Sequence, residues 1–399
     1  MNPPSGPLRG LRVLDACDAL AVYATKLLVN LGAEVIRLEP PGGDPMRQYP
    51  PVIDGISTYF EHFNAGKRSV SLDLSNEEGV GWLERLVASC NAVVESGQAG
   101  ELLSARVGRQ RLCASRPGLV LISVTPFGLH GPQAAQRGGD LIAAAESGLL
   151  ALNGRPDAPP YRPGGEQAAH MAGLLAANAA LLGLFEQQRS GRGCHVEVPV
   201  NFAAALSTLQ TANANFYTWH GRVPQRRGMG TAAYRSLCRA RDGWVVLIAL
   251  PGQWEKLVRL MAEHGAAGDL VDEAYQDAEH RVAQADRINA LIEAFTRRFH
   301  KQELSALAQA AGVACTPVNG VADIAADPYL TQRGFFRDVE HPGWGRGVSY
   351  PAPPWHFAER ELGTREPAAC AGADNRAVWI EELGMDGATP AAHGGEAAP

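Results

Sequence analysis

The chain has 399 residues, of which 46% are hydrophobic and 20% are charged, and its formal net charge at pH 7 is −6. This length favours two domains, and the apolar content is sufficient for a packed core. The acidic balance argues against general nucleic-acid binding. We find no uninterrupted apolar run of membrane-spanning length and no signal-peptide pattern, so we expect a cytoplasmic protein without a membrane partner.

The first half of the chain alternates between short β-rich runs and helical stretches. The predicted strands are Val13–Asp15, Val35–Leu38, Val70–Leu72, Ala92–Glu95 and Val120–Val124. The predicted helices are Ala24–Leu31, Glu78–Ala88 and Leu102–Ala114, with a capping box at Ser75–Glu78 before the second of them. This alternation predicts βαβ units and therefore an α/β fold with a Rossmann-like parallel sheet and helices on both faces.

The second half begins with a Pro/Gly-rich loop at 156–165. The elements predicted after it are a long helix (Ala168–Gln188), a strand (Val196–Val200), a helical stretch (Asn201–His220), a strand (Trp244–Leu250) and helices over Trp254–Glu263, Arg281–Arg298 and Gln302–Ala311. We therefore predict a large domain over 1–220, a small mixed α/β domain over 221–325, a return to the large domain over 326–385 and a disordered tail over 386–399.

The seven cysteines are widely spread and include no Cys-x-x-Cys pair. No histidine cluster accompanies them at metal-ligand spacing. We therefore expect reduced thiols and no metal site.

One loop of the predicted sheet is a candidate binding site. The strand that contains Arg37 ends at Leu38 and runs into the glycine-rich turn Pro40–Asp44. Open parallel sheets bind ligands outside the carboxyl ends of their strands, and a cation beside such a loop suits a phosphate-bearing ligand. The same pattern also fits an ordinary exit from strand to loop.

Several motifs occur in an order that points to one family. They are Gly32–Asp44, Phe63–Leu74, Phe127–Pro132, Gly139–Asp140 with Ser147–Leu149, Ser190–Val198 and Asp327–Leu330. With these motifs, over roughly Leu11–Phe357, the chain resembles the class III CoA-transferases. The resemblance implies an interlocked dimer, in which each chain threads through the other.

The resemblance also implies a reaction. Family members move CoA from an acyl thioester to a free carboxylate, through a mixed anhydride formed by an aspartate of the protein. That aspartate opens the motif Asp-x-x-Ala-Gly at the start of the long helix. The matching segment here is Ala169–Gly173, so alanine occupies the nucleophile position. A methyl group cannot open a thioester.

Two neighbours of Ala169 are weak substitutes for the aspartate. Glu166 has a longer side chain, which a shifted loop would bring near the same point, but at a helix start it also offsets the helix dipole. His170 is a candidate general base, but it points about 100° around the helix from residue 169. We therefore assign no catalytic residue from the sequence.

The resemblance places five residues at the CoA site, namely Arg37, Lys67, Leu72, Arg106 and Arg137. The cations would neutralise the 3′-phosphate and the diphosphate, and Lys67 and Leu72 fall in the segment that lines the adenine. The four cations also fit solvated surface residues. We expect CoA or acyl-CoA as a substrate and no permanently bound cofactor.

These observations favour the non-nucleophilic, aspartate-lacking subunit of a heteromeric acyl-CoA:carboxylate CoA-transferase, because some family members pair such a chain with an aspartate-bearing homologue. We expect the chain to be inactive alone and to form its interlocked dimer with that homologue. Two alternatives stay open. One is different acyl-CoA chemistry (lyase, hydratase or isomerase), and the other is a CoA-binding protein with a structural or regulatory role. The acyl group and the acid are not determined by the sequence.

Overall fold

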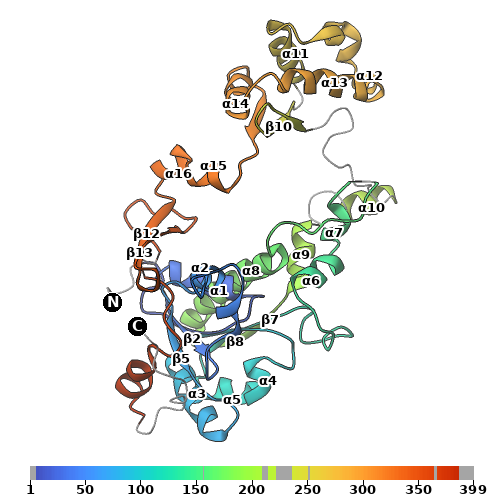
Figure 1. Ribbon diagram of the computed structural model, residues 1–399. Coiled ribbons are helices and arrows are strands. Elements are labelled where there is room, and N and C mark those ends of the chain that lie inside the picture. Colours follow the sequence, from blue (N-terminus) through green and yellow to red (C-terminus); the bar gives the residue numbers. More distant parts are fainter. Residues whose placement is uncertain are drawn as a thin grey trace. The chain divides into compact units, whose positions relative to one another are not determined.

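The computed structural model describes residues 6–155, 157–208, 214–221, 236–249, 252–363 and 366–385. The chain divides into two compact units (Figure 1). The first unit takes Met1–Ala151, Arg162–Val223 and Thr331–Pro399, and the second takes Leu152–Tyr161 and Pro224–Leu330. The predicted tail at 386–399 lies outside the described residues.

A six-stranded parallel sheet forms the centre of the first unit. Its strands are β1 (Arg12–Ala16), β2 (Glu34–Glu39), β5 (Arg68–Ser71), β6 (Ala92–Ser96), β7 (Val120–Thr125) and β8 (Cys194–Pro199). They lie in the order β5-β2-β1-β6-β7-β8, and every neighbouring pair is parallel. This order is that of a doubly wound nucleotide-binding fold, so the predicted Rossmann-like sheet is confirmed.

Helices cover both faces of the sheet (Figure 1). The helices on one face are α1 (Val22–Asn30), α2 (Thr58–Asn64), α8 (Gln167–Ser190) and α9 (Val200–Thr208). Those on the other face are α3 (Glu77–Ser89), α4 (Leu103–Val107), α5 (Arg109–Ser115) and the π-helical segment η6 (Arg376–Glu382). The small residues of α8 let it approach β7 closely, because a Cβ on Gly183 would lie 2.6 Å from the side chain of Val120.

The remaining elements of the first unit, including two that cross its boundaries with the second unit, are short. They are η1 (Pro45–Gln48), β3 (Val52–Ile53), β4 (Ile56–Ser57), α6 (Asp140–Glu146), α7 (Leu149–Leu152), α10 (Ala214–His220), α16 (Pro328–Gln332), β12 (Phe336–His341), η5 (Pro342–Trp344) and β13 (Arg346–Pro351). Strands β12 and β13 pair as an antiparallel hairpin.

The second unit has a three-stranded antiparallel sheet in the order β11-β10-β9. Its elements are β9 (Leu237–Arg239), β10 (Trp244–Ile248), α11 (Trp254–Glu263), η3 (Gly268–Val271), η4 (Glu273–Gln276), α12 (Ala278–Ala283), α13 (Ala285–Thr296), α14 (Lys301–Ala310), β11 (Ala314–Pro317) and α15 (Val321–Ala325). Its helices and sheet share one apolar core. The predicted helix over Arg281–Arg298 is therefore two helices, α12 and α13.

Helix α8 is long and apolar enough, by length and composition, to cross a membrane. Asn178 interrupts this segment, as the sequence analysis expects of each candidate run, although its mean hydropathy is high. Half of its most apolar window is buried, and its residues belong to the core against β7 and α1. A core helix of a globular unit has the same composition.

Candidate active site

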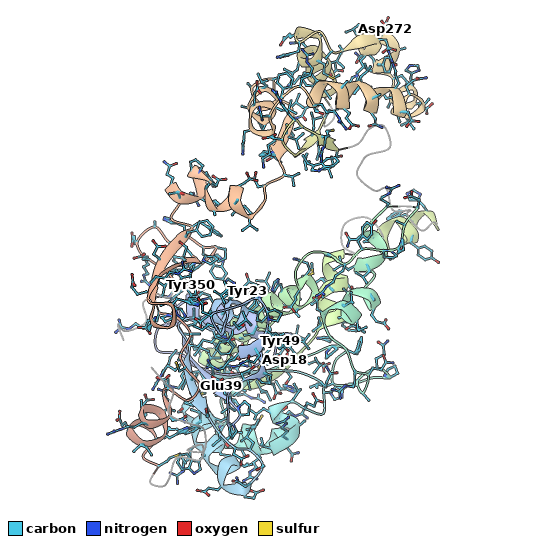
Figure 2. The ribbon with its side chains drawn as sticks, in the orientation of Figure 1. Asp18, Tyr23, Glu39, Tyr49, Asp272 and Tyr350 are labelled. Carbon is cyan, nitrogen blue, oxygen red and sulfur yellow. The ribbon has the colours of Figure 1, made fainter. Side chains whose placement is uncertain are left out.

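The order of the strands reverses between β1 and β6, and ligands of such sheets bind at the carboxyl ends on either side of this point. Asp18 follows β1 there, and Ser96 ends β6. The Ser96 hydroxyl accepts a hydrogen bond from the Asp18 N–H at 2.9 Å and donates one to the Asp18 carboxylate. Burial raises the pKa of Asp18. The sequence analysis missed Asp18 (labelled in Figure 2), although its position directly after the first strand was available as a signal.

Arg37 and Lys67 lie in one buried ion-pair network. The Arg37 guanidinium donates to Asp15 at 2.8 Å and to Asp44, and the Lys67 ammonium donates to Asp15 at 2.7 Å and to Thr25 at 2.8 Å. Arg37 is 2% exposed and Lys67 is 4% exposed. Burial alone would lower the pKa of Arg37, but Asp15 and Asp44 raise it above its usual range. These cations are thus balanced inside the protein, and their predicted contact with CoA stays a prediction.

The other three predicted CoA residues lie in different surroundings. Leu72 is buried in the core under α3, whereas Arg106 is exposed on α4. Arg137 is also exposed, and it pairs with Glu101 at 3.1 Å. Arg106 and Arg137 therefore present their charge to solvent, while Arg37 and Lys67 do not.

Ala169 lies in the first turn of α8, with only 2% of its surface exposed. Its backbone N–H donates to the carboxylate of Asp140 at 3.1 Å. Asp140 opens α6, and it also pairs with Arg162 at 3.2 Å. A methyl side chain thus occupies the predicted nucleophile position. The backbone N–H of the same residue is bound by the carboxylate of Asp140 from another helix. Asp140 belongs to one of the family motifs, but its contact with the backbone of Ala169 was not predicted from the sequence.

Glu166 directly precedes α8, and its carboxylate accepts a hydrogen bond from the Tyr59 hydroxyl at 2.7 Å. Tyr59 comes from α2. Burial and the Glu166 carboxylate together raise the pKa of Tyr59. The structure therefore brings Glu166 into a tyrosine–carboxylate pair beside the start of α8.

His170 is half-buried against two aromatic rings. Its imidazole lies 5.3 Å from the ring of Tyr23 and 5.8 Å from that of Phe63, measured between ring centres. Burial lowers the pKa of His170, and the charges of Glu166 and Asp140 only partly oppose this shift. The imidazole is therefore neutral at pH 7, which is the form that accepts a proton.

Two cavities lined by described residues lie elsewhere in the first unit. The larger, about 640 Å³, is apolar and is lined by residues of α8, β8 and α9. The smaller, about 510 Å³, is lined by residues between Arg333 and Leu362, including three arginines. Among the described residues, no group of three or more His, Cys, Asp or Glu side chains is arranged to hold a metal ion.

Comparison with known proteins agrees with this fold. The model of CoA-transferase family III matches residues 8–375. The chain is 33% identical to succinyl-CoA:(R)-benzylsuccinate CoA-transferase subunit BbsE of Thauera aromatica, over 93% of each chain. It is 31% identical to the succinyl-CoA:mesaconate CoA-transferase of Haloarcula hispanica, over 95% of this chain and 97% of that one.

A solved structure has the same fold. The crystal structure of a CAIB/BAIF family protein from Brucella suis superposes with a TM-score of 0.85 at 29% identity, over 95% of this chain and 99% of that one. The doubly wound sheet and the family match agree. The chain belongs to CoA-transferase family III.

Proposed function

We propose that the chain is the non-nucleophilic subunit of a heteromeric acyl-CoA:carboxylate CoA-transferase. The observation that carries this proposal is Ala169 in the first turn of α8, at the position where the family resemblance places the nucleophilic aspartate. The first step of the family reaction is attack of a carboxylate oxygen on the thioester carbonyl carbon, with departure of the CoA thiolate. A methyl side chain has no electron pair for this step, so the attacking carboxylate must come from a partner chain.

The surroundings of Ala169 support loss of the nucleophile in a retained site. Asp140 binds the backbone N–H of residue 169, and the helix begins at Gln167. In this proposal the partner subunit carries the aspartate, and its own copy of the site performs the transfer. This chain supplies the other half of the dimer and its CoA-binding groups.

An apolar face on α8 and α9 supports the proposal that this chain binds a partner subunit. Large apolar side chains that are at least 45% exposed gather on these two helices, namely Leu174, Leu182, Phe185, Phe202 and Leu206. Phe202 and Leu206 also line the 640 Å³ cavity. Exposed apolar surface of this kind marks interaction sites. We assign it to a homologous subunit, because the resemblance implies an interlocked dimer and the Thauera relative is itself named as a subunit.

CoA binding is the second part of the proposal. Arg106 and Arg137 are exposed cations in the segments that match the CoA site of the family, and guanidinium groups bind phosphate oxygens in a bidentate manner. CoA and acyl-CoA are then substrates rather than resident cofactors. We propose CoA or acyl-CoA as the donor-side ligand and a carboxylic acid as the acceptor.

A second candidate function rests on the pair Tyr59–Glu166 and on neutral His170. A half-buried imidazole with a lowered pKa near the Glu166 carboxylate suits proton abstraction from an acyl-CoA. This arrangement favours a lyase, hydratase or isomerase on the same fold. The third possibility is a CoA-binding structural or regulatory protein.

One reconstitution experiment separates the three functions. The full chain is purified alone and also co-expressed with a homologue that has aspartate at the position of Ala169, and CoA transfer from succinyl-CoA is assayed with a panel of carboxylic acids. We expect no transfer by the chain alone, a stable complex with the homologue, and transfer by the complex that is lost when the homologue's aspartate is replaced by alanine.

Other outcomes contradict the proposal. Substantial transfer by the pure chain would show that it carries its own nucleophile. Turnover of acyl-CoA without transfer, lost in His170→Ala, would select the second function. CoA binding without turnover in any pairing would select the third.

A further inference from the structure

A chain of hydrogen bonds crosses the sheet on the face covered by α4 and α5. It begins at Glu95 on β6, which is fully buried. The Glu95 carboxylate accepts hydrogen bonds from the backbone N–H of Ser104 at 2.7 Å, from its hydroxyl at 2.6 Å, and from the hydroxyl of Ser123 at 2.5 Å. Glu95 thus holds the first turn of α4.

The series of hydrogen bonds continues from Ser123 to the surface. The Ser123 oxygen lies 2.9 Å from Nε2 of His195 on β8, and Nδ1 of His195 lies 3.1 Å from the guanidinium of Arg109 on α5. The Ser123 hydroxyl donates its one hydrogen bond to the Glu95 carboxylate. Its oxygen must therefore accept from Nε2–H of His195. His195 then accepts from Arg109 at Nδ1, because arginine only donates.

This order of groups excludes a hydrolytic triad. In a triad the imidazole lies between the carboxylate and the hydroxyl, and the hydroxyl faces the substrate. Here Ser123 lies between Glu95 and His195, and it is fully buried in the sheet. The arrangement therefore fixes the position of neighbouring groups and does not activate a nucleophile.

The two ends of the chain of bonds flank Arg106. Ser104, bound to Glu95, precedes Arg106 by two residues, and Arg109, bound to His195, follows it by three. Between Arg106 and Arg109 the polypeptide backbone turns at Gly108, whose φ of 90° is strained for residues other than glycine. Helix α4 has only five residues, and these two attachments add to the buried side chains of Leu102 and Leu103 in fixing the backbone that carries Arg106.

We propose that the relay Glu95–Ser123–His195–Arg109 positions Arg106 for the phosphate groups of CoA. This inference rests on the proposed CoA contact of Arg106 and adds the residues that hold it. Arg106 is the binding residue, and Ser123 and His195 are positioning residues that do not touch CoA. Because the relay fixes the backbone that carries Arg106, less backbone entropy is lost when the phosphate binds.

The test is a double-mutant cycle on CoA affinity, measured by calorimetry with the purified full chain. We expect Arg106→Ala to weaken binding about tenfold, as for the loss of one charge-assisted contact. His195→Phe, which removes both hydrogen bonds of the imidazole, should weaken it about fivefold. In the Arg106→Ala background His195→Phe should have no further effect, because it acts through Arg106.

Two controls separate positioning from folding. His195→Gln retains an amide that donates to Ser123 and accepts from Arg109, so it should restore affinity to within about twofold. Ser190→Ala, at an exposed serine, should bind CoA as the natural chain does. If Arg106→Ala leaves CoA affinity unchanged, both the CoA contact and the relay are wrong. If Arg106→Ala weakens binding but His195→Phe does not, or the two effects add fully, only the relay is wrong.

Discussion

Ala169 differs from an aspartate by one carboxylate group, yet its neighbours remain polar. Asp140 binds its backbone, and Glu166 and His170 lie in the same turn of chain. Neither neighbour replaces the missing group in the same geometry, because the Glu166 carboxylate is held by Tyr59 and the His170 ring packs against the rings of Tyr23 and Phe63. In the proposed function, residue 169 therefore lacks only the nucleophile, and polar groups surround it.

His62 on α2 provides a prediction about pH. Burial, and then the charges of Lys26 and His170, lower its pKa from 6.5 to about 4. Between these two values the unfolded chain binds a proton that the folded chain excludes, so the free energy of unfolding falls as the pH falls. The slope contributed by one such group is at most about 1.4 kcal/mol per pH unit.

We therefore expect His62→Gln to remove this part of the slope. Urea unfolding of the natural chain and the variant at pH 7, 6 and 5 should give free energies that differ increasingly toward low pH, with the variant the less sensitive. His356→Gln, at an exposed histidine, should keep the natural slope. Parallel curves for the natural chain and His62→Gln would show that His62 is protonated in the fold.

The position of residue 169 in the fold was predictable, whereas the partners of the predicted cations were not. The family motif located position 169, and the structure places it at the start of the predicted helix. The family resemblance placed Arg37 and Lys67 at the CoA site, but their acidic partner Asp15 comes from β1, and its register against them is a tertiary property. Local sequence does not distinguish a cation that meets a phosphate from one that meets a buried carboxylate.

At the scale of elements, the strands were the most predictable part. The predicted runs lie within or close to β1, β2, β5, β6, β7 and β8, because strands buried on both faces read as continuous apolar segments. The start of α3 was predicted less well. Its cap is Asn76, whose side chain accepts from the N–H of Gly79, and not Ser75. Adjacent capping residues compete, and the backbone path decides between them.

The C-terminal segment covers an edge of the sheet that the sequence did not reveal. Strand β5 is the last strand on one side, and Asp374 binds its backbone as a neighbouring strand would. The Ser69 N–H donates to the Asp374 carboxylate at 2.8 Å, and the Asp374 N–H donates to the Ser69 carbonyl at 2.9 Å. Such cover protects an edge strand from pairing with other chains.

This contact predicts the effect of Asp374→Ala. The substitution removes the acceptor for the Ser69 N–H and the ion pair with Arg68 at 3.2 Å. We expect the free energy of unfolding to fall by about 1–3 kcal/mol, the cost of leaving a buried donor unpaired. Chemical denaturation measures it, with Glu186→Ala at an exposed position as the matched control. A change below about 0.5 kcal/mol would mean that the edge is covered by other contacts.

At the scale of the whole molecule, the doubly wound unit brings segments from both ends of the chain together. Asp18 and Ser96 lie at the carboxyl ends of its strands. The loop that carries Asp44, which pairs with Arg37, begins at the same edge. The second unit interrupts it between Val223 and Thr331. The apolar face on α8 and α9 then leaves the first unit with a surface that suits a second chain. The proposed heteromeric transferase accounts for this surface and for Ala169 together.

The claim that this chain has no attacking carboxylate is tested most directly by intact-mass measurement after incubation with succinyl-CoA. In the family mechanism the nucleophile first takes the acyl group and then carries CoA as a thioester, so an active chain gains a mass that hydroxylamine removes. We predict that the natural chain stays unmodified and that Ala169→Asp gains the adduct at residue 169. A hydroxylamine-sensitive adduct on the natural chain, mapped by peptide analysis to Glu166 or Asp140, would contradict the account.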